Sequence, residues 1–211
     1  MIIPAKHENI QKGSIVLGAD ASEKINSTAL SAAAYNLEGL FPELVRCDIW
    51  EPGPDESGEV IVDLSATIGE KIKWYLDNYD VVAILYDPYQ LHSLMVDMKK
   101  KYDRTGLKKL FVEFPQGAQR VLSDEAFYQW IQDKKLRRVR HEGLRQHVLS
   151  ATAKSNERGF RIDKGTGYGG NNDAAVSSSM ACYGASVRVR AKRKFINVGT
   201  AGKEPAKKET G

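Results

Sequence analysis

Cysteine is scarce in this sequence, and its two residues, Cys47 and Cys182, are far apart. No CxxC pair is present, which excludes a cysteine zinc site and a disulfide framework. We therefore expect both thiols to be buried as small hydrophobic side chains in a reducing compartment.

Long apolar runs and nucleotide-binding loops are also lacking. No apolar run approaches the roughly 18 residues of a membrane helix, and the N-terminal segment MIIPAKHENI has no signal-peptide core. We expect a soluble intracellular protein with no membrane partner. The phosphate loop GxxxxGKS or GxxxxGKT is absent, so the sequence offers no motif for an ATPase.

Positive charge is unevenly distributed along the chain. The net charge is +4, but residues 188–211 hold eight Lys or Arg against two Glu, which leaves residues 1–187 with a net charge of −2. The body is therefore not a strongly cationic nucleic-acid-binding module. We expect one domain over 1–187, followed by a basic, flexible tail over 188–211.

The apolar pattern predicts an α/β fold with a mixed β-sheet flanked by helices. VVAILYD, for example, is rich in β-branched residues and suggests a strand buried on both faces. The predicted strands are 14–19, 27–36, 43–50, 81–87, 107–114 and 160–164. The predicted helices are 63–78, 90–102, 123–133, 143–156 and 173–185, with Ser123 as the N-cap of the third. Three successive strands followed by alternating strands and helices give a mixed sheet.

Three aspartates, Asp20, Asp87 and Asp173, stand where the chain leaves an apolar strand or enters a helix. A carboxylate beside a buried run is costly unless a cation meets it. Hydrolysis of a phosphodiester needs a nucleophilic water, a stabilised leaving oxygen and charge neutralisation, which two Mg²⁺ or Mn²⁺ ions about 4 Å apart supply. Carboxylate oxygens suit these ions. The three aspartates together predict a metal-dependent nuclease.

Each of these aspartates, taken singly, is also typical of a turn or a helix cap. Other acids lie near predicted element ends as well, namely Asp48, Asp63, Asp80, Glu113 and Asp163. Spacing alone therefore leaves the structural and the catalytic interpretation open.

The order of these segments over residues 14–185 resembles the nuclease domain of tailed-phage terminase large subunits, which has an RNase H-like fold. IVLGADASEKINSTAL resembles the first acid-bearing segment of that family, AILYDPYQ the second and NNDAAVSSSMACYGA the third. FRIDKG resembles the strand with a lysine that precedes the last acid. The resemblance implies an RNase H-like domain.

The resemblance also implies that Asp20, Asp87 and Asp173 bind two Mg²⁺ or Mn²⁺ ions in an endonuclease. Such an enzyme cuts concatemeric viral double-stranded DNA during genome packaging in the host cytoplasm. Its partners would be the ATPase part of the large subunit, the portal and the small terminase subunit. The chain departs from the family at Asn26, where members often have a further Asp, and in lacking an ATPase motif. We therefore expect an excised domain or a split subunit.

Two alternatives remain open at this point. One is a Holliday-junction resolvase or transposase-like nuclease of the same fold. The other is a non-catalytic adaptor that binds DNA or a partner protein through its basic tail.

Basic residues cluster in the segment DKKLRRVRHEGLR, where they could contact DNA phosphates or form a solvated helix end and loop. The candidates for phosphate contact are Lys134, Lys135, Arg137, Arg138 and Arg140. Lys164 could contact the scissile phosphate or be an ordinary surface lysine.

Overall fold

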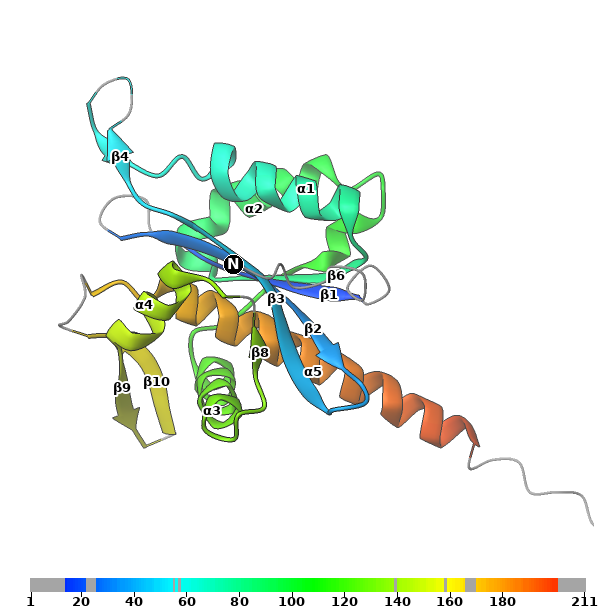
Figure 1. Cartoon of the computed structure of the whole chain (residues 1–211). Coiled ribbons are helices and arrows are strands. Elements are labelled where there is room, and N and C mark those ends of the chain that lie inside the picture. Colours follow the sequence, from blue (N-terminus) through cyan, green and yellow to red (C-terminus); the bar gives the residue numbers. More distant parts are fainter. Residues whose placement is uncertain are drawn as a thin grey trace, which may run out of the picture.

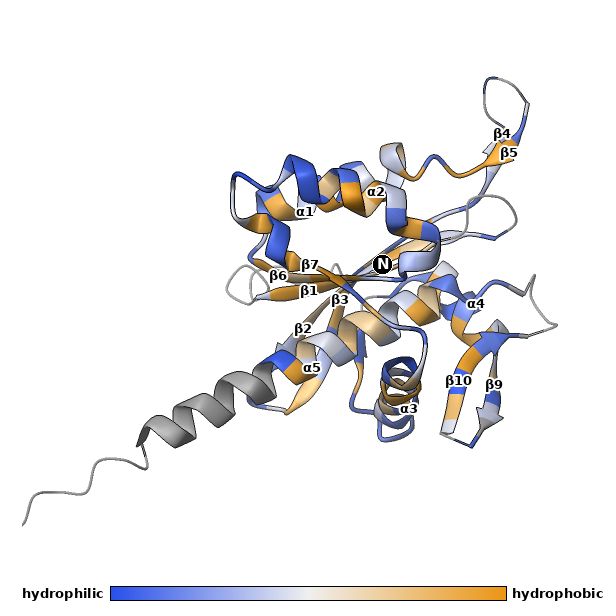
Figure 2. Ribbon diagram, turned by 180° about the vertical axis from the view of Figure 1, so that it is seen from behind, coloured by the Kyte–Doolittle hydropathy of each residue, from blue (hydrophilic) through white to orange (hydrophobic). Residues whose placement is uncertain are grey.

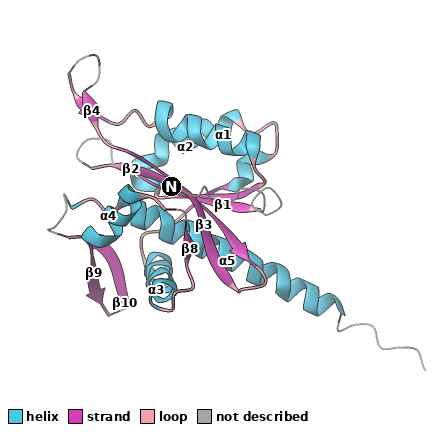
Figure 3. Ribbon diagram, viewed as in Figure 1, coloured by secondary structure: helices cyan, strands magenta, loops and turns pink. Residues whose placement is uncertain are grey.

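A computed structural model of the chain describes residues 14–21, 26–54, 56, 58–138, 140–157, 159–165 and 170–200; for 156 and 189–200 it describes the backbone alone. Within these residues, six strands form one mixed sheet in the order β7-β6-β1-β2-β3-β8 (Figures 1 and 3). Its strands are β1 Ile15–Asp20, β2 Thr28–Asn36, β3 Phe41–Trp50, β6 Val81–Tyr86, β7 Phe111–Glu113 and β8 Arg137–Arg138.

Strand β2 runs antiparallel to both of its neighbours, β1 and β3. Strands β6 and β7 are parallel to β1, and β8 is parallel to β3. As a result, the carboxyl ends of β1, β3, β6 and β7 lie at the same edge of the sheet. Outside this sheet, β4 (Gly53–Pro54) pairs with β5 (Val60–Ile61), and β9 (Ala151–Asn156) pairs with β10 (Gly159–Lys164).

Helices cover both faces of the sheet (Figure 1). A π-helical turn, Ser65–Gly69, leads into α1 (Glu70–Asn78), which lies with α2 (Pro88–Lys101) on one face. Helices α3 (Ala118–Gln132), α4 (Glu142–Ser150) and α5 (Asp173–Thr200) lie on the other. No helix in the described part of the chain is long and apolar enough to span a membrane.

The alternation of side chains along β1 divides the hydrophobic core into two clusters. Ile15 and Leu17 face α1 and α2 and belong to a cluster with Ile72 and Met95. Val16 belongs to the other cluster, which includes residues of α3 and α5. Figure 2 shows the apolar character of β1, β6 and β7 between the two helical layers. Cys47 and Cys182 are both buried and free, as predicted.

Helix α5 packs directly on β1 because Gly18 has no side chain. A Cβ at this position would collide with the carbonyl oxygen of Ser177 and lie 2.8 Å from the nitrogen of Ala181. The close approach is matched further along α5, where a Cβ at Gly184 would lie 2.9 Å from Val16. Small residues on both elements therefore fix the register of the helix on the strand, and with it the position of the first residue of α5.

Most predicted elements are present, but three predictions about local structure are wrong. Ser123 does not cap a helix: α3 begins five residues earlier, and Ser123 is buried inside it, where its hydroxyl bonds that of Ser179 at 2.6 Å. Residues 151–156 form β9, not the end of a helix, because they pair with β10. Leu107–Leu110 form a 3-10 turn, so the predicted strand over 107–114 is shortened to β7.

The helix predicted over 173–185 extends as α5 to Thr200, into the segment predicted to be a flexible tail. Residues 201–211 lie outside the described part of the chain. The division into a domain over 1–187 and a tail over 188–211 stays a prediction.

Candidate active site

The parallel pairing of β1 with β6 places Asp20 beside Asp87. The last paired residues of the two strands are Ala19 and Tyr86, and the aspartates follow them directly. The backbone N–H of Asp87 donates to the carbonyl of Ala19 at 3.4 Å. The two acids therefore emerge next to each other at the carboxyl edge of the sheet.

Asp87 is also the N-cap of α2, which fixes its orientation. Its Oδ1 accepts the backbone N–H of Tyr89 at 2.9 Å, and Pro88 occupies the first helical position. The structural interpretation of this aspartate as a cap is therefore correct. Because the cap uses one carboxylate oxygen, the other oxygen can still serve as a ligand.

Asp173 reaches the same region from the first residue of α5. It is 4% exposed, and the hydroxyl of Ser27 donates to its Oδ2 at 2.7 Å. The imidazole Nδ1 of His147 accepts the backbone N–H of Ala174 at 3.1 Å, which caps the start of the helix. This bond requires an unprotonated Nδ1, and desolvation lowers the pKa of His147, which favours the neutral ring. The residues preceding β2 and in α4 thus hold Asp173 in place.

The charges of Asp87 and Asp173 act on the carboxyl group of Asp20. The pKa of Asp20 is raised from 3.8 to about 8, mainly by desolvation; the charges of Asp173 and Asp87 also raise it, whereas those of Arg120 and Lys164 lower it. Asp20 ends β1, Asp87 and Asp173 stand at the starts of α2 and α5, Arg120 lies in α3 and Lys164 ends β10. The fold therefore brings the three predicted acids to one edge of the sheet, with Lys164 close enough for its charge to act on Asp20.

The carboxylate oxygens of Asp20, Asp87 and Asp173 are of the kind that a hard divalent cation prefers, although the three side chains are not closely gathered. Among the described residues, no group of three or more His, Cys, Asp or Glu side chains is already arranged as a metal site. Yet burial and two neighbouring acids disfavour the ionised form of Asp20, and a bound divalent cation would offset this cost by attracting the carboxylate. The assignment of Asp20, Asp87 and Asp173 as metal ligands stays a prediction.

Sequence reasoning missed Glu51, which directly follows β3. Its Oε2 accepts the side-chain N–H of Asn171 at 3.3 Å, and its Oε1 lies 3.9 Å from Nε2 of His147. Desolvation raises the pKa of Glu51, and the charge of Asp173 adds to this effect. The signal was available, because β3 is parallel to β1 and its carboxyl end must reach the same edge.

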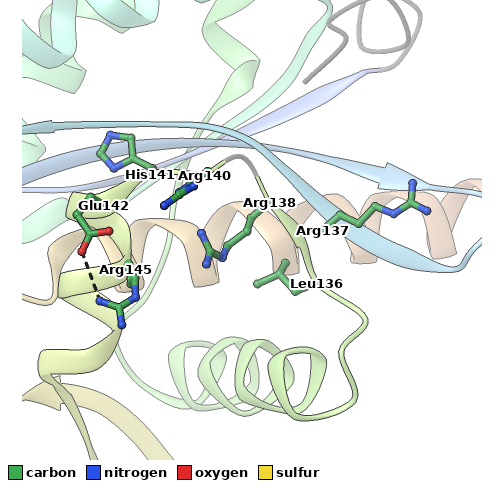
Figure 4. Close-up of a pocket in the computed structure, with 7 residues that line it drawn as sticks. All are labelled: Leu136, Arg137, Arg138, Arg140, His141, Glu142 and Arg145. Atoms are coloured by element: carbon green, nitrogen blue, oxygen red, sulfur yellow. Dashed lines mark hydrogen bonds and ion pairs between the residues drawn. The ribbon is translucent and has the colours of Figure 1, made fainter. Parts of the chain in front are cut away.

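Three of the predicted DNA-binding residues gather at a pocket before α4 (Figure 4). This pocket, with a volume of about 770 Å³, is lined by Leu136, Arg137, Arg138, Arg140, His141, Glu142 and Arg145. We call it the arginine pocket. Arg137 pairs with Glu43 at 3.4 Å and Arg145 with Glu142 at 3.4 Å. Four arginines face only one acid in the lining, so the pocket is cationic.

Lys134 and Lys135 are not among the residues that line the arginine pocket. Lys135 instead pairs with Asp133 at 3.3 Å, at the end of α3. The structure thus separates the basic run of the sequence into a group of arginines before α4 and two lysines that follow α3.

Comparison with known proteins relates the chain to one group of folds. No protein-family model and no curated protein matches the sequence. Among solved structures, the HK97 bacteriophage large terminase superposes with a TM-score of 0.65 at 18% identity, over 82% of this chain and 40% of that protein. The chain thus spans less than half of the HK97 protein.

Two nuclease domains match over most of their length. The large terminase nuclease domain of Thermus phage P74-26 gives a TM-score of 0.54 at 12% identity and covers 86% of this chain and 88% of that one. The large terminase nuclease of thermophilic phage G20c with bound magnesium gives 0.54 at 11% identity, with 82% of each chain covered. These likenesses confirm the predicted fold: an RNase H-like α/β domain of the kind found in phage terminase nucleases.

Proposed function

We propose that this chain is a metal-dependent DNA endonuclease, the nuclease domain of a phage large terminase. In that role it cuts concatemeric viral double-stranded DNA during genome packaging. The observation that supports this proposal is the placement of Asp20, Asp87 and Asp173 at one edge of the sheet, where both other acids act on Asp20, in a fold like that of terminase nucleases.

The three aspartates would hold two Mg²⁺ or Mn²⁺ ions. When bound, such ions lower the pKa of an attacking water and stabilise the leaving 3′ oxygen. Asp20 is central, since its carboxyl is influenced by both other acids. Ser27 and the cap of α2 orient the other two carboxylates before any cation arrives. This preorganisation reduces the cost of assembling the site.

DNA would lie across the edge that carries the aspartates. Lys164, whose charge acts on Asp20, would meet the phosphate at the cleavage position. The arginine pocket lies at the start of α4, while His147, near the end of this helix, contacts the start of α5. Nine residues of helix measure about 13 Å, or roughly four base pairs of rise along duplex DNA. The arginines would thus hold the backbone a few base pairs away from the cut.

The ATPase part of the large subunit, the portal and the small terminase subunit are the partners that follow from this role. They would act with the chain in the host cytoplasm. The share of the HK97 large terminase that the chain matches, 40%, fits one domain of such a machine.

Plasmid cleavage tests this function. Wild-type protein should nick and linearise supercoiled DNA with millimolar Mn²⁺ and should be inactive in EDTA. Asp20→Asn should be inactive, while Asp77→Asn, which changes an exposed aspartate on α1, should cut like the wild type. Equal cutting by wild type and Asp20→Asn, or no cutting by the wild type at any metal concentration, would contradict the assignment.

A further inference from the structure

A buried ion pair on α3 faces the β9–β10 hairpin. Nε of Arg120 and Oδ2 of Asp124 are 2.7 Å apart, one helical turn from each other, and the two residues are 4% and 0% exposed. Burying two charges gains little stability by itself, because desolvation offsets the attraction. The structural role of the pair therefore lies in what its remaining hydrogen-bonding atoms hold.

Both charged groups bond to the backbone of one residue, Ile162 in β10. Oδ2 of Asp124 accepts the N–H of Ile162 at 2.8 Å, and Nη2 of Arg120 donates to the carbonyl of Ile162 at 3.3 Å. In an antiparallel pair, alternate residues direct both backbone groups away from the partner strand. The ion pair therefore takes the place of a neighbouring strand along the outer edge of β10.

The other side of the ion pair is anchored in the protein interior. Oδ1 of Asp124 accepts the hydroxyl of Ser179 on α5 at 2.7 Å, and Nη1 of Arg120 donates to Gln116 at 2.7 Å. The same α5 begins with Asp173. The hairpin is thus tied, through two buried charges, to the helix that supplies one of the three candidate ligands.

The neighbouring outward residue of β10 is also docked on α3. The N–H of Phe160 donates to Glu125 at 3.3 Å, and its ring meets that of Tyr128 edge-on with centroids 5.4 Å apart. A two-stranded hairpin is marginally stable alone, and β9–β10 forms no ladder with the main sheet. Its position relative to the aspartates therefore depends on these contacts with α3 and on its packing against the end of α4.

Lys164 ends β10, two residues beyond Ile162, which is about 7 Å along a strand. The next residue, Gly165, lies against α4 so closely that a Cβ there would collide with the carbonyl of Ser150. Lys164 therefore lies near the start of α5, because the hydroxyl of Ser150 donates to the carbonyl of Asn171, two residues before Asp173. The charges of Lys164 and Arg120 both act on Asp20, but Lys164 is exposed, whereas Arg120 is buried and cannot touch a substrate. Arg120 can therefore act only within the protein, whereas Lys164 can contact a substrate.

We propose that Arg120 and Asp124 are positioning residues, which clamp β10 at Ile162 and thereby hold Lys164 near the start of α5, where it meets the scissile phosphate. This rests on the nuclease function proposed above. The clamp itself can be tested without any cleavage assay.

Amide hydrogen exchange tests the clamp directly. In the wild type, the N–H of Ile162 should exchange as slowly as core amides, because a buried carboxylate accepts it. Asp124→Asn should speed exchange at Phe160 and Ile162 at least about tenfold. Fast exchange at Ile162 in the wild type would overturn the clamp, whether or not the protein cuts DNA.

Single-turnover cleavage at saturating Mn²⁺ tests the link to Lys164. Lys164→Gln should slow cleavage by roughly 10²-fold, the loss typical of one transition-state donor, without changing exchange in β10. Asp124→Asn should slow cleavage to a similar extent, and the double variant should be no slower than the slower single variant. Rate losses that multiply, or an unchanged rate in Asp124→Asn, would refute the positioning role.

Asp48→Asn is the matched control for lost stability. Asp48 pairs with Arg46 at 3.0 Å and with Lys71 at 3.3 Å, on the face covered by α1, so its loss should lower the melting temperature but not the cleavage rate. If Asp124→Asn does not fold, Arg120→Lys keeps the buried positive charge but cannot reach Asp124, Gln116 and Ile162 together. It should show the same faster exchange and slower cleavage.

If the wild type cuts no DNA, the proposed function fails while exchange at Ile162 still reports on the clamp. If the wild type cuts and Ile162 exchanges fast, the function stands and the clamp is wrong.

Discussion

Replacing Asp20 by Asn should change the pH dependence of stability in a defined direction. The pKa of Asp20 is about 8 in the folded protein and 3.8 for a free side chain, because desolvation and two acids disfavour its charged form. The folded state therefore binds this proton more tightly than the unfolded state. The stabilising contribution of protonated Asp20 is fully present below pH 4, falls as pH rises through the window from 4 to 8, and is lost above pH 8.

The size of the effect follows from the two pKa values. A difference of this size corresponds to an upper limit of about 6 kcal/mol, and relaxation and water entry leave a few kcal/mol in practice. A change of 1 kcal/mol shifts the melting temperature of a domain of this size by roughly 2–4 °C. The melting temperature of Asp20→Asn should therefore rise by roughly 5–10 °C relative to that of the wild type as the pH increases from 5 to 9. The buffer must be free of divalent metal.

The assay is thermal unfolding of both proteins from pH 5 to pH 9 with EDTA, repeated with Mn²⁺. A cation that binds the native state should raise the wild-type melting temperature. At a cation concentration of 100 times the dissociation constant, the free energy of unfolding should rise by about 2.7 kcal/mol. The cation should bind more tightly as pH approaches 8, because it displaces the proton of Asp20. A difference between the two proteins that is independent of pH, or an equal Mn²⁺ response in both, would refute this reasoning.

Three further outcomes are expected. Asp87→Asn should abolish cleavage and keep the fold, and should raise metal-free stability because one repelling charge is removed; unchanged plasmid nicking would discard this ligand. Gly18→Ala should destabilise the protein by about 3 kcal/mol or more in urea titrations, because its Cβ collides with α5; wild-type stability would show that α5 can move away from β1. Arg138→Gln with Arg140→Gln should reduce the slope of log affinity for DNA against log salt by roughly 2; an unchanged slope would remove the arginine pocket from the DNA path.

Local sequence patterns predicted the elements that are held by local or purely apolar forces. The buried runs of β1 and β6 were recognisable from their β-branched and aliphatic residues, and so were Asp20 and Asp87 at their ends. Asp173 follows a polar stretch and begins α5, and only the resemblance to a family distinguished it from other acids near element ends. Its place in the site depends on the long-range fit of α5 to Gly18.

The elements that the sequence did not predict depend on residues far away in the chain. The sequence predicts a helix over ATAKSN, yet this segment forms β9 because β10 pairs with it, a case in which tertiary pairing overrides local preference. Helix α3 begins at Ala118 and not at Ser123, and it includes Arg120 and Asp124, which are buried against β10 and α5. A charge pattern alone does not distinguish a solvated pair from one that holds a distant backbone.

The most direct test of the central claim is the position of bound metal. Crystals grown with millimolar MnCl₂ and measured at the manganese absorption edge should show anomalous density between the carboxylates of Asp20, Asp87 and Asp173. Such density, lost in Asp20→Asn, would support a cation site built from these three side chains. Anomalous density elsewhere in the protein, or none between the three carboxylates, would contradict it.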